Sequence, residues 1–139
     1  MATMTKNKLV RLRLTQPEDA ELKAVAAVTG KPTGTLAANW VREGVRRARF
    51  PAIEFRDGLL GRVAYLAGTR WPAWMIAQLV EECAGETAAA AKHLQRPEAL
   101  VKMALAYAKA YPEEIQACRE LSERDFAAWQ ADMPHLEKL

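Results

Sequence analysis

Serine, cysteine and histidine are scarce in this sequence of 139 residues, which contains one serine, two cysteines and two histidines. Nucleophilic catalysis needs a serine or cysteine beside a base, whereas Ser122, three residues before Asp125, matches a helix-capping pattern. Cys83 and Cys118 lie far apart with no ligand-like neighbours. The sequence therefore predicts no enzyme activity, no disulfide framework, no metal and no other cofactor.

Long hydrophobic runs are also absent, because the longest, such as ALVKMALAYA, contains a charge and is shorter than the roughly 20 residues needed to span a bilayer. No apolar signal-peptide segment is visible near the first methionine. We therefore expect a cytoplasmic protein that does not associate with membranes. A hydrophobic fraction of 50% with 27% charged residues is typical of one ordinary globular domain or two small ones.

Charge is distributed unevenly along the chain. Residues 1–50 hold ten Lys and Arg against four acids, whereas residues 51–139 hold ten bases and thirteen acids. The last segment, residues 112–139, has three bases and seven acids. A basic beginning and an acidic end predict two different partners.

The beginning of the sequence, KNKLVRLRLT, alternates basic and apolar residues in the manner of a short strand. Thr15, Pro17 and Glu18 then form a helix-start pattern, and Gly30 marks that helix's end. A second helix is predicted over residues 34–49, with an apolar stripe that includes Leu36 and Trp40. This strand-helix-helix unit is too small for a sufficient core, and its strand has no partner in the chain.

Pairing of the strand with its copy in a second chain would solve both problems, giving a homodimer or a higher even oligomer. Val10, Leu12 and Leu14 would then pack on the helices, while Arg11 and Arg13 would face outward on a two-stranded ribbon that fits the major groove of DNA. The start of the second helix is expected to hold a phosphate. The predicted DNA-binding set is Lys8, Leu9, Arg11, Arg13, Lys31, Thr33 and Thr35. The alternative is a surface strand with solvated arginines in an ordinary α+β domain.

Residues 8–49, containing VRLRLT and ELKAVAAVTGKPTGTLAANWVREGVRR, resemble a ribbon-helix-helix domain of the kind found in bacterial repressors and antitoxins. Leu9 departs from this resemblance, because a polar base-reading residue is more usual there.

The second half of the sequence is predicted to form two short strands, residues 53–56 and 62–66. Helices that begin near residues 72, 86, 97, 112 and 122 are predicted to follow. The pair 86–94 and 97–110 has helix-turn-helix proportions. Arg96, Lys102 and Lys109 are candidates for a second DNA contact, and the alternative is that this pair is a structural helical core or a dimer contact. Residues 53–115, with AGTR and ALAYAKAYPEEI, resemble the domain of unknown function family 433. That resemblance implies a VapB-type antitoxin that acts beside a PIN-like ribonuclease toxin.

The acidic tail carries apolar residues at helical spacing. We expect it to bind a basic protein partner, or alternatively to pack on its own core or on the dimer mate. The predicted partner-binding residues are Phe126, Trp129, Met133 and Leu136, with the acids Asp125, Asp132 and Glu137.

Taken together, the predicted fold is mainly α with a short N-terminal strand. A ribbon-helix-helix domain at 1–50 precedes a small hairpin and helix-turn-helix domain at 51–111, and an acidic helical segment at 112–139 follows. The predicted function is that of an antitoxin that binds operator DNA as a dimer and neutralises a PIN-like toxin. The alternative is a free-standing DNA-binding transcriptional regulator.

Overall fold

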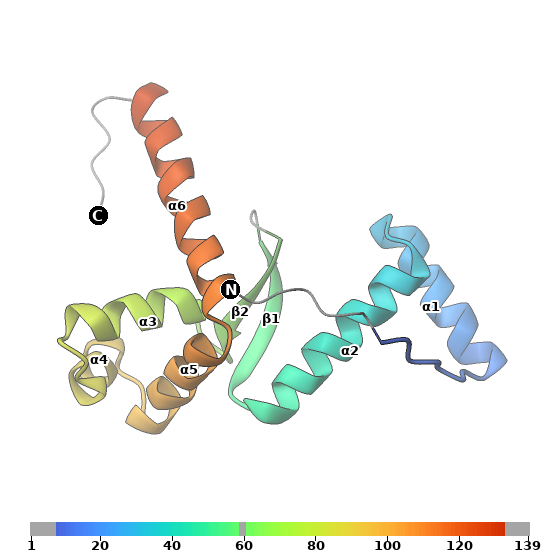
Figure 1. The fold of residues 1–139 in the computed structure, drawn as a ribbon, viewed down its shortest axis with the longest axis horizontal. Helices are drawn as coiled ribbons and strands as arrows, with labels where there is room; N and C mark the ends of the chain where they lie inside the picture. Colours follow the sequence, from blue (N-terminus) through green and yellow to red (C-terminus); the bar gives the residue numbers. More distant parts are fainter. Residues whose placement is uncertain (1–7, 59–60, 133–139) are drawn as a thin grey trace. The chain divides into compact units, whose positions relative to one another are not determined.

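The computed structural model describes residues 8–58 and 61–132, and the described chain is mainly helical with one antiparallel hairpin (Figure 1). The chain divides into an N-terminal unit, Met1–Arg42, and a C-terminal unit, Glu43–Leu139. No helix in the described ranges is long and apolar enough to cross a membrane. The elements are α1 (Gln16–Thr29), α2 (Thr33–Arg49), β1 (Ile53–Gly58), β2 (Gly61–Leu66), α3 (Ala73–Glu82), α4 (Thr87–Leu94), α5 (Glu98–Ala110) and α6 (Pro112–Asp132).

The predicted N-terminal strand is absent from the single chain, in which residues 8–15 have no regular secondary structure. A strand needs a hydrogen-bonded neighbour, and the described chain offers none to this segment. The predicted packing of Val10, Leu12 and Leu14 on the helices is absent as well. The exposed fraction of the apolar side chains falls from 83% at Leu9 to 43% at Leu14.

Helix α1 begins and ends where the sequence predicted. The Thr15 hydroxyl accepts a hydrogen bond from the Glu18 amide at 3.3 Å, and the Glu18 carboxylate accepts one from the Thr15 amide at 3.1 Å. The helix ends at Gly30, whose φ of 70° is a left-handed conformation that glycine adopts without strain. The predicted capping box is therefore confirmed.

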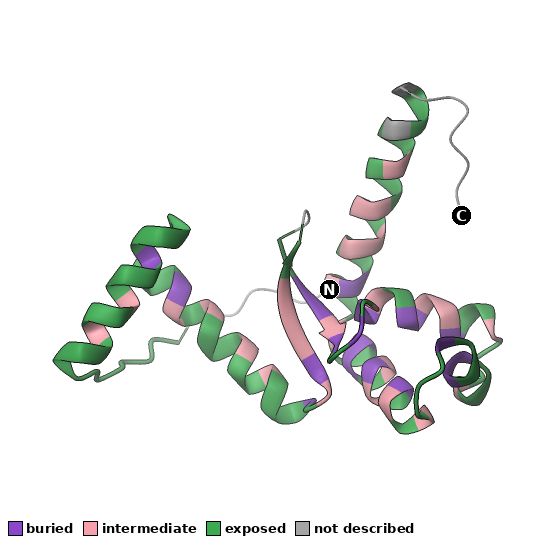
Figure 2. Ribbon diagram, turned by 180° about the vertical axis from the view of Figure 1, so that it is seen from behind, coloured by how far each residue is buried: buried purple, intermediate pink, exposed green. Residues whose placement is uncertain are grey.

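The N-terminal unit has almost no core of its own. Among its described residues only Ala26 and Leu36 are buried hydrophobics, and Figure 2 shows helix α1 and the start of α2 as largely exposed. The predicted apolar stripe of α2 exists as a helix face, but Trp40 and Val41 on it are about half exposed, at 46% and 49%. A unit of this size with two buried side chains falls short of the burial needed for independent stability.

The hairpin of the C-terminal unit forms over residues 53–66, as predicted. Strands β1 and β2 pair antiparallel, from Ile53 opposite Leu66 to Gly58 opposite Gly61. A turn then leads into α3, and the Thr69 side chain stabilises this turn through two hydrogen bonds. Its buried hydroxyl donates to the Leu66 carbonyl at 2.8 Å and accepts from the Trp71 amide at 3.1 Å.

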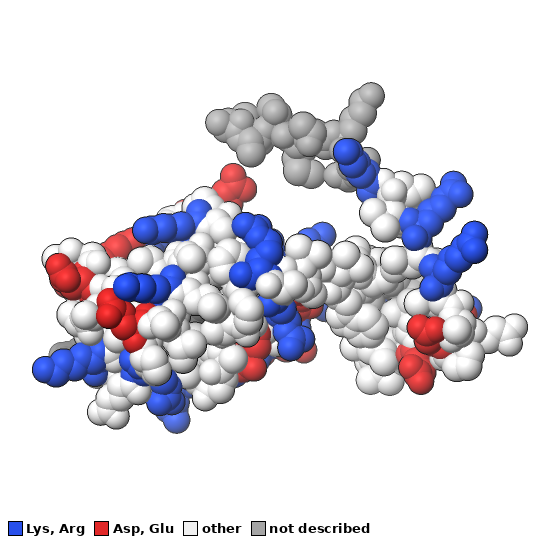
Figure 3. Space-filling view, turned by 90° about the horizontal axis from the view of Figure 1, so that it is seen from below, with Lys and Arg blue, Asp and Glu red and all other residues white. Residues whose placement is uncertain are grey.

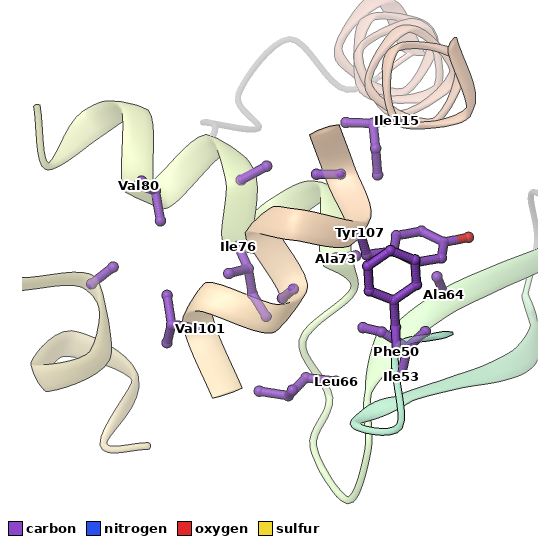
Figure 4. Close-up of a cluster of buried hydrophobic side chains, with 14 of the residues drawn as sticks. Phe50, Ile53, Ala64, Leu66, Ala73, Ile76, Val80, Val101, Tyr107 and Ile115 are labelled. Carbon is purple, nitrogen blue, oxygen red and sulfur yellow. The ribbon is translucent and has the colours of Figure 1, made fainter. Parts of the chain in front are cut away.

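The core of the C-terminal unit lies between the hairpin and helices α3, α4 and α5 (Figure 4). Tyr107 of α5 is completely buried, and its ring meets the ring of Phe50 edge to face, with centroids 5.4 Å apart. Helices α4 and α5 meet at Gln95, which takes a left-handed conformation with φ of 55°. Between these two helices, Ala90, Leu94 and Val101 are buried and Leu105 is half-buried.

One predicted helix boundary, at Ser122, is wrong. Ser122 and Asp125 were expected to start a new helix, but α6 runs without a break from Pro112 to Asp132. Residues 113–132 contain no glycine or proline, and the Glu, Ala, Arg and Leu residues around Ser122 favour a continuous helix. Ser122 is thus an interior residue of α6 and not a cap.

Candidate functional site

The basic side chains of the N-terminal segment are accessible. Lys8, Arg11 and Arg13 are exposed, and none of them forms an ion pair with another described residue. Figure 3 shows Lys and Arg side chains projecting from the N-terminal unit on the face that it draws. Leu9, which the sequence placed among the base-reading residues, is also exposed. These side chains are therefore available to an anionic ligand.

The start of helix α2 is a second place for an anion. Lys31, Thr33 and Thr35 are all exposed, and α2 begins at Thr33. The Leu36 amide donates to the Pro32 carbonyl at 3.0 Å. The amides that precede Leu36 in this first turn have no helical acceptor, as at every helix start, and the helix dipole favours a negative charge there. The start of α2 thus offers donors for the predicted phosphate contact.

An apolar surface on α1 and α2 has no partner within the described chain. Val25 and Val28 of α1 are exposed, Val28 to 88%, and the α2 side chains Trp40 and Val41 are about half exposed. Exposed apolar residues at such density, in the same unit as the exposed apolar side chains of residues 9–14, are typical of a surface that another molecule covers. We call this the α1/α2 apolar surface.

The three bases of the predicted second DNA contact have different surroundings. Arg96 lies in the turn before α5, and Lys102 and Lys109 lie seven residues apart on α5, which places them on one side of the helix. Lys102 is 3.5 Å from the Glu98 carboxylate. A hydrogen bond from Thr87 and the charge of Lys102 lower the pKa of Glu98, so Glu98 is charged at neutral pH and offsets Lys102. This weakens the attraction of α5 for phosphate.

Helix α6 carries the part of the predicted partner-binding set that lies in the described ranges. Asp125 is exposed and Phe126 is half-buried. Trp129 and Asp132 belong to the same helix, but their side chains are not described. The remaining predicted residues, Met133, Leu136 and Glu137, lie outside the described residues.

A polar cluster that sequence reasoning missed joins the end of α2 to α5 and α6. The Arg46 guanidinium donates to the Tyr107 hydroxyl at 3.0 Å and to the Glu114 carboxylate at 2.6 Å, while Tyr107 donates a short hydrogen bond to Glu114. Burial and the Glu114 carboxylate raise the pKa of the Tyr107 hydroxyl well above its ordinary value. Arg49 donates to the Tyr111 hydroxyl at 3.0 Å. These arginines therefore have a structural role, and no local pattern in the sequence pointed to it.

No group of three or more His, Cys, Asp or Glu side chains within residues 8–58 and 61–132 could hold a metal ion. Cys83 and Cys118 are both free and half-buried. Comparison of the chain with protein-family models, with curated protein sequences and with solved structures gives no match. A functional assignment therefore depends on the residues described above.

Proposed function

We propose that this protein is a dimeric DNA-binding antitoxin. Its N-terminal unit would read operator DNA, and its acidic C-terminal helix would neutralise a PIN-like ribonuclease toxin. The N-terminal segments of two copies would pair as a ribbon-helix-helix dimer that presents Arg11 and Arg13 to the major groove. The resemblance of residues 8–49 to ribbon-helix-helix domains and that of residues 53–115 to the domain of unknown function family 433 also support this proposal.

The observation that carries this proposal is the incompleteness of the N-terminal unit. Its segment 8–14 presents unpaired backbone groups and exposed apolar side chains, and the α1/α2 apolar surface lies uncovered. A second copy would supply both the missing strand and the missing cover. The exposed Arg11 and Arg13 side chains would then lie side by side with their counterparts. A merely solvated strand gives no reason for so many exposed apolar side chains.

The DNA-binding half of the proposal is tested with a duplex that the wild-type protein enriches from a random pool, compared with a scrambled duplex of the same composition. Arg13→Ala is expected to weaken binding to the enriched duplex by about 1–3 kcal/mol and to the scrambled duplex much less. The matched control is Arg124→Ala, which removes an exposed arginine from α6. Equal losses on both duplexes would make Arg13 a phosphate contact and would contradict base reading.

Salt dependence provides an independent check on the phosphate contacts. With roughly six phosphate contacts per dimer, the logarithm of the binding constant should fall with the logarithm of salt concentration at a slope of about −5. Replacement of Lys31 by Ala in both copies should make this slope shallower by about two. An unchanged slope would remove Lys31 from the interface.

The toxin-binding half is tested with a chain truncated at Glu120 and with a PIN-like nuclease encoded beside it. We expect the shortened protein to fold and bind DNA but to leave the nuclease active. Intact neutralisation by the shortened protein, or unfolding of the C-terminal unit, would contradict the proposed role of α6. If no such nuclease is encoded nearby, the alternative of a free-standing regulator is favoured.

A further inference from the structure

A crevice of about 400 Å³ opens between α3, α4 and α6 in the C-terminal unit. Its apolar floor comes from one face of α3 and the residue before it, because Trp71, Trp74, Met75 and Leu79 follow one another at helical spacing. None of the four is fully buried, because Met75 is exposed, and Trp71, Trp74 and Leu79 are half-buried and pack against the core from outside. The crevice is large enough for a few side chains and is open to a protein ligand.

Two exposed acids line the crevice, Glu82 of α3 and Glu123 of α6. His93 of α4 lines it as well, and no Lys or Arg is among its described lining residues. The Glu82 carboxylate accepts a hydrogen bond from the neutral Gln78 amide at 3.3 Å and has no ion-pair partner within the described residues. Two indoles next to two carboxylates make a site in which a cation is attracted by both ring faces and charges.

We propose that this crevice binds an arginine-bearing amphipathic helix of a protein partner. An arginine side chain would lay its aliphatic stem and its planar guanidinium on Trp71 or Trp74 and reach Glu82 or Glu123 with its donors. Neighbouring leucine-like side chains would fill the space over Met75 and Leu79. The inference rests on the proposed binding of a protein partner and adds the surface and the chemistry by which that partner is recognised.

The position of Phe126 extends this surface. Ser122 and Glu123 of α6 line the crevice, and Phe126 lies three and four residues further along the same side of the helix. Figure 1 shows the C-terminal part of α6 extending away from α3 and α5. A helix seated in the crevice would therefore run onto the part of α6 that the proposed function assigns to the partner.

The test uses the intact protein and a synthetic alanine-based helix that carries leucine and arginine along one face. Its control is the same peptide with glutamate in place of each arginine. The indole N–H signals in ¹H–¹⁵N NMR spectra are assigned with Trp71→Phe and Trp74→Phe variants. We expect the arginine peptide to shift the Trp71 and Trp74 signals in a saturable manner, the glutamate peptide to shift neither, and the Trp40 signal to stay in place.

Charge removal sharpens this test. The double variant Glu82→Gln/Glu123→Gln is expected to weaken binding of the arginine peptide about tenfold, the equivalent of one lost cation contact. The control Glu86→Gln/Glu113→Gln removes two exposed acids that do not line the crevice and should leave the affinity unchanged. Equal weakening in both double variants would show a general charge effect and would overturn the proposal.

Other occupants give different results. If free arginine methyl ester shifts the two indole signals at the same concentration as the peptide, the crevice is a small-cation site and the proposal is wrong. If neither peptide shifts them, the crevice is not a docking site. DNA binding and nuclease neutralisation are measured on the same preparation. If the peptide does not bind but both activities are present, the crevice proposal alone is wrong. If DNA binding or neutralisation is absent, the proposed function is wrong, whether or not the peptide binds.

Discussion

The two units of this chain differ in how completely each one buries its own apolar residues. The C-terminal unit encloses large side chains such as Tyr107, Ile53 and Leu66 within a continuous cluster. The N-terminal unit buries only Ala26 and Leu36 among its described residues and exposes larger ones, including Trp40. Since apolar burial is the main favourable term in folding, the C-terminal unit can stand alone, whereas the burial within the N-terminal unit falls short of what independent stability requires. We propose that a second molecule, another copy of the chain, supplies the missing burial.

The largest expected effect comes from breaking the proposed dimer. Leu12→Glu puts a charge where the ribbon would bury a leucine in each of two copies. Loss of about 2 kcal/mol per copy would raise the dimer dissociation constant on the order of a thousandfold. Light scattering at micromolar concentration should then give a monomer.

The control for this variant is Ala20→Glu, which adds the same charge at an exposed position of α1. Ala20 lies on the side of α1 opposite Leu22 and is not one of the residues that define the α1/α2 apolar surface. The control should keep the mass of the wild type. A dimer that survives Leu12→Glu would place the interface elsewhere.

A valine-to-alanine substitution in each unit compares a buried position of the C-terminal unit with an exposed position of the N-terminal unit. Val101 of α5 is fully buried, whereas Val28 of α1 is 88% exposed. Val101→Ala is expected to lower the free energy of unfolding of the C-terminal unit by about 2 kcal/mol. Val28→Ala should change the stability of the single chain, measured at concentrations below the dimer dissociation constant, by less than about 0.5 kcal/mol.

Urea unfolding followed by circular dichroism measures both variants. The C-terminal unit should account for the transition that does not depend on protein concentration. A loss in Val28→Ala that appears only at concentrations at which the dimer forms would show that the second copy covers Val28, as proposed for the α1/α2 apolar surface. A large loss in Val28→Ala at every concentration would contradict the exposure of Val28 in the single chain.

The smallest expected effect concerns the polar cluster at the end of α2. Tyr107→Phe removes the hydroxyl that bonds to Arg46 and Glu114 and should cost about 1 kcal/mol at neutral pH. The raised pKa of Tyr107 means that folding favours its neutral form, so this contribution is present below pH 10.0, the ordinary value, and is lost as the pH rises further.

The stability difference between the wild type and Tyr107→Phe should therefore shrink above about pH 10. Tyr65→Phe is the control, because Tyr65 is half-buried and its hydroxyl makes no hydrogen bond within the described residues. A gap that stays constant with pH would contradict the assigned titration.

The parts of this fold that sequence could predict depend on local chemistry. The capping box of Thr15 and Glu18 and the glycine at position 30 define α1 because their partners lie within a few residues. The same local rule failed at Ser122, where a capping pattern lies inside a helix whose neighbouring residues favour continuation.

Long-range contacts could not be predicted in this way. Arg46 and Glu114 are 68 residues apart, and nothing near either residue indicates their pairing. The crevice also depends on three helices that meet only in the folded chain. The DNA-binding and toxin-binding residues stay predictions, because a single chain contains neither the second copy nor the partner that would position them.

Hydrogen–deuterium exchange of the backbone amides of residues 8–14, measured on the intact protein over a range of concentrations, tests the proposed ribbon most directly. If two copies pair through this segment, its amides are protected at micromolar concentration, and the protection disappears on dilution and in Leu12→Glu. If these amides exchange freely at every concentration while helices α3 and α5 stay protected, no ribbon forms and the proposed dimer is wrong.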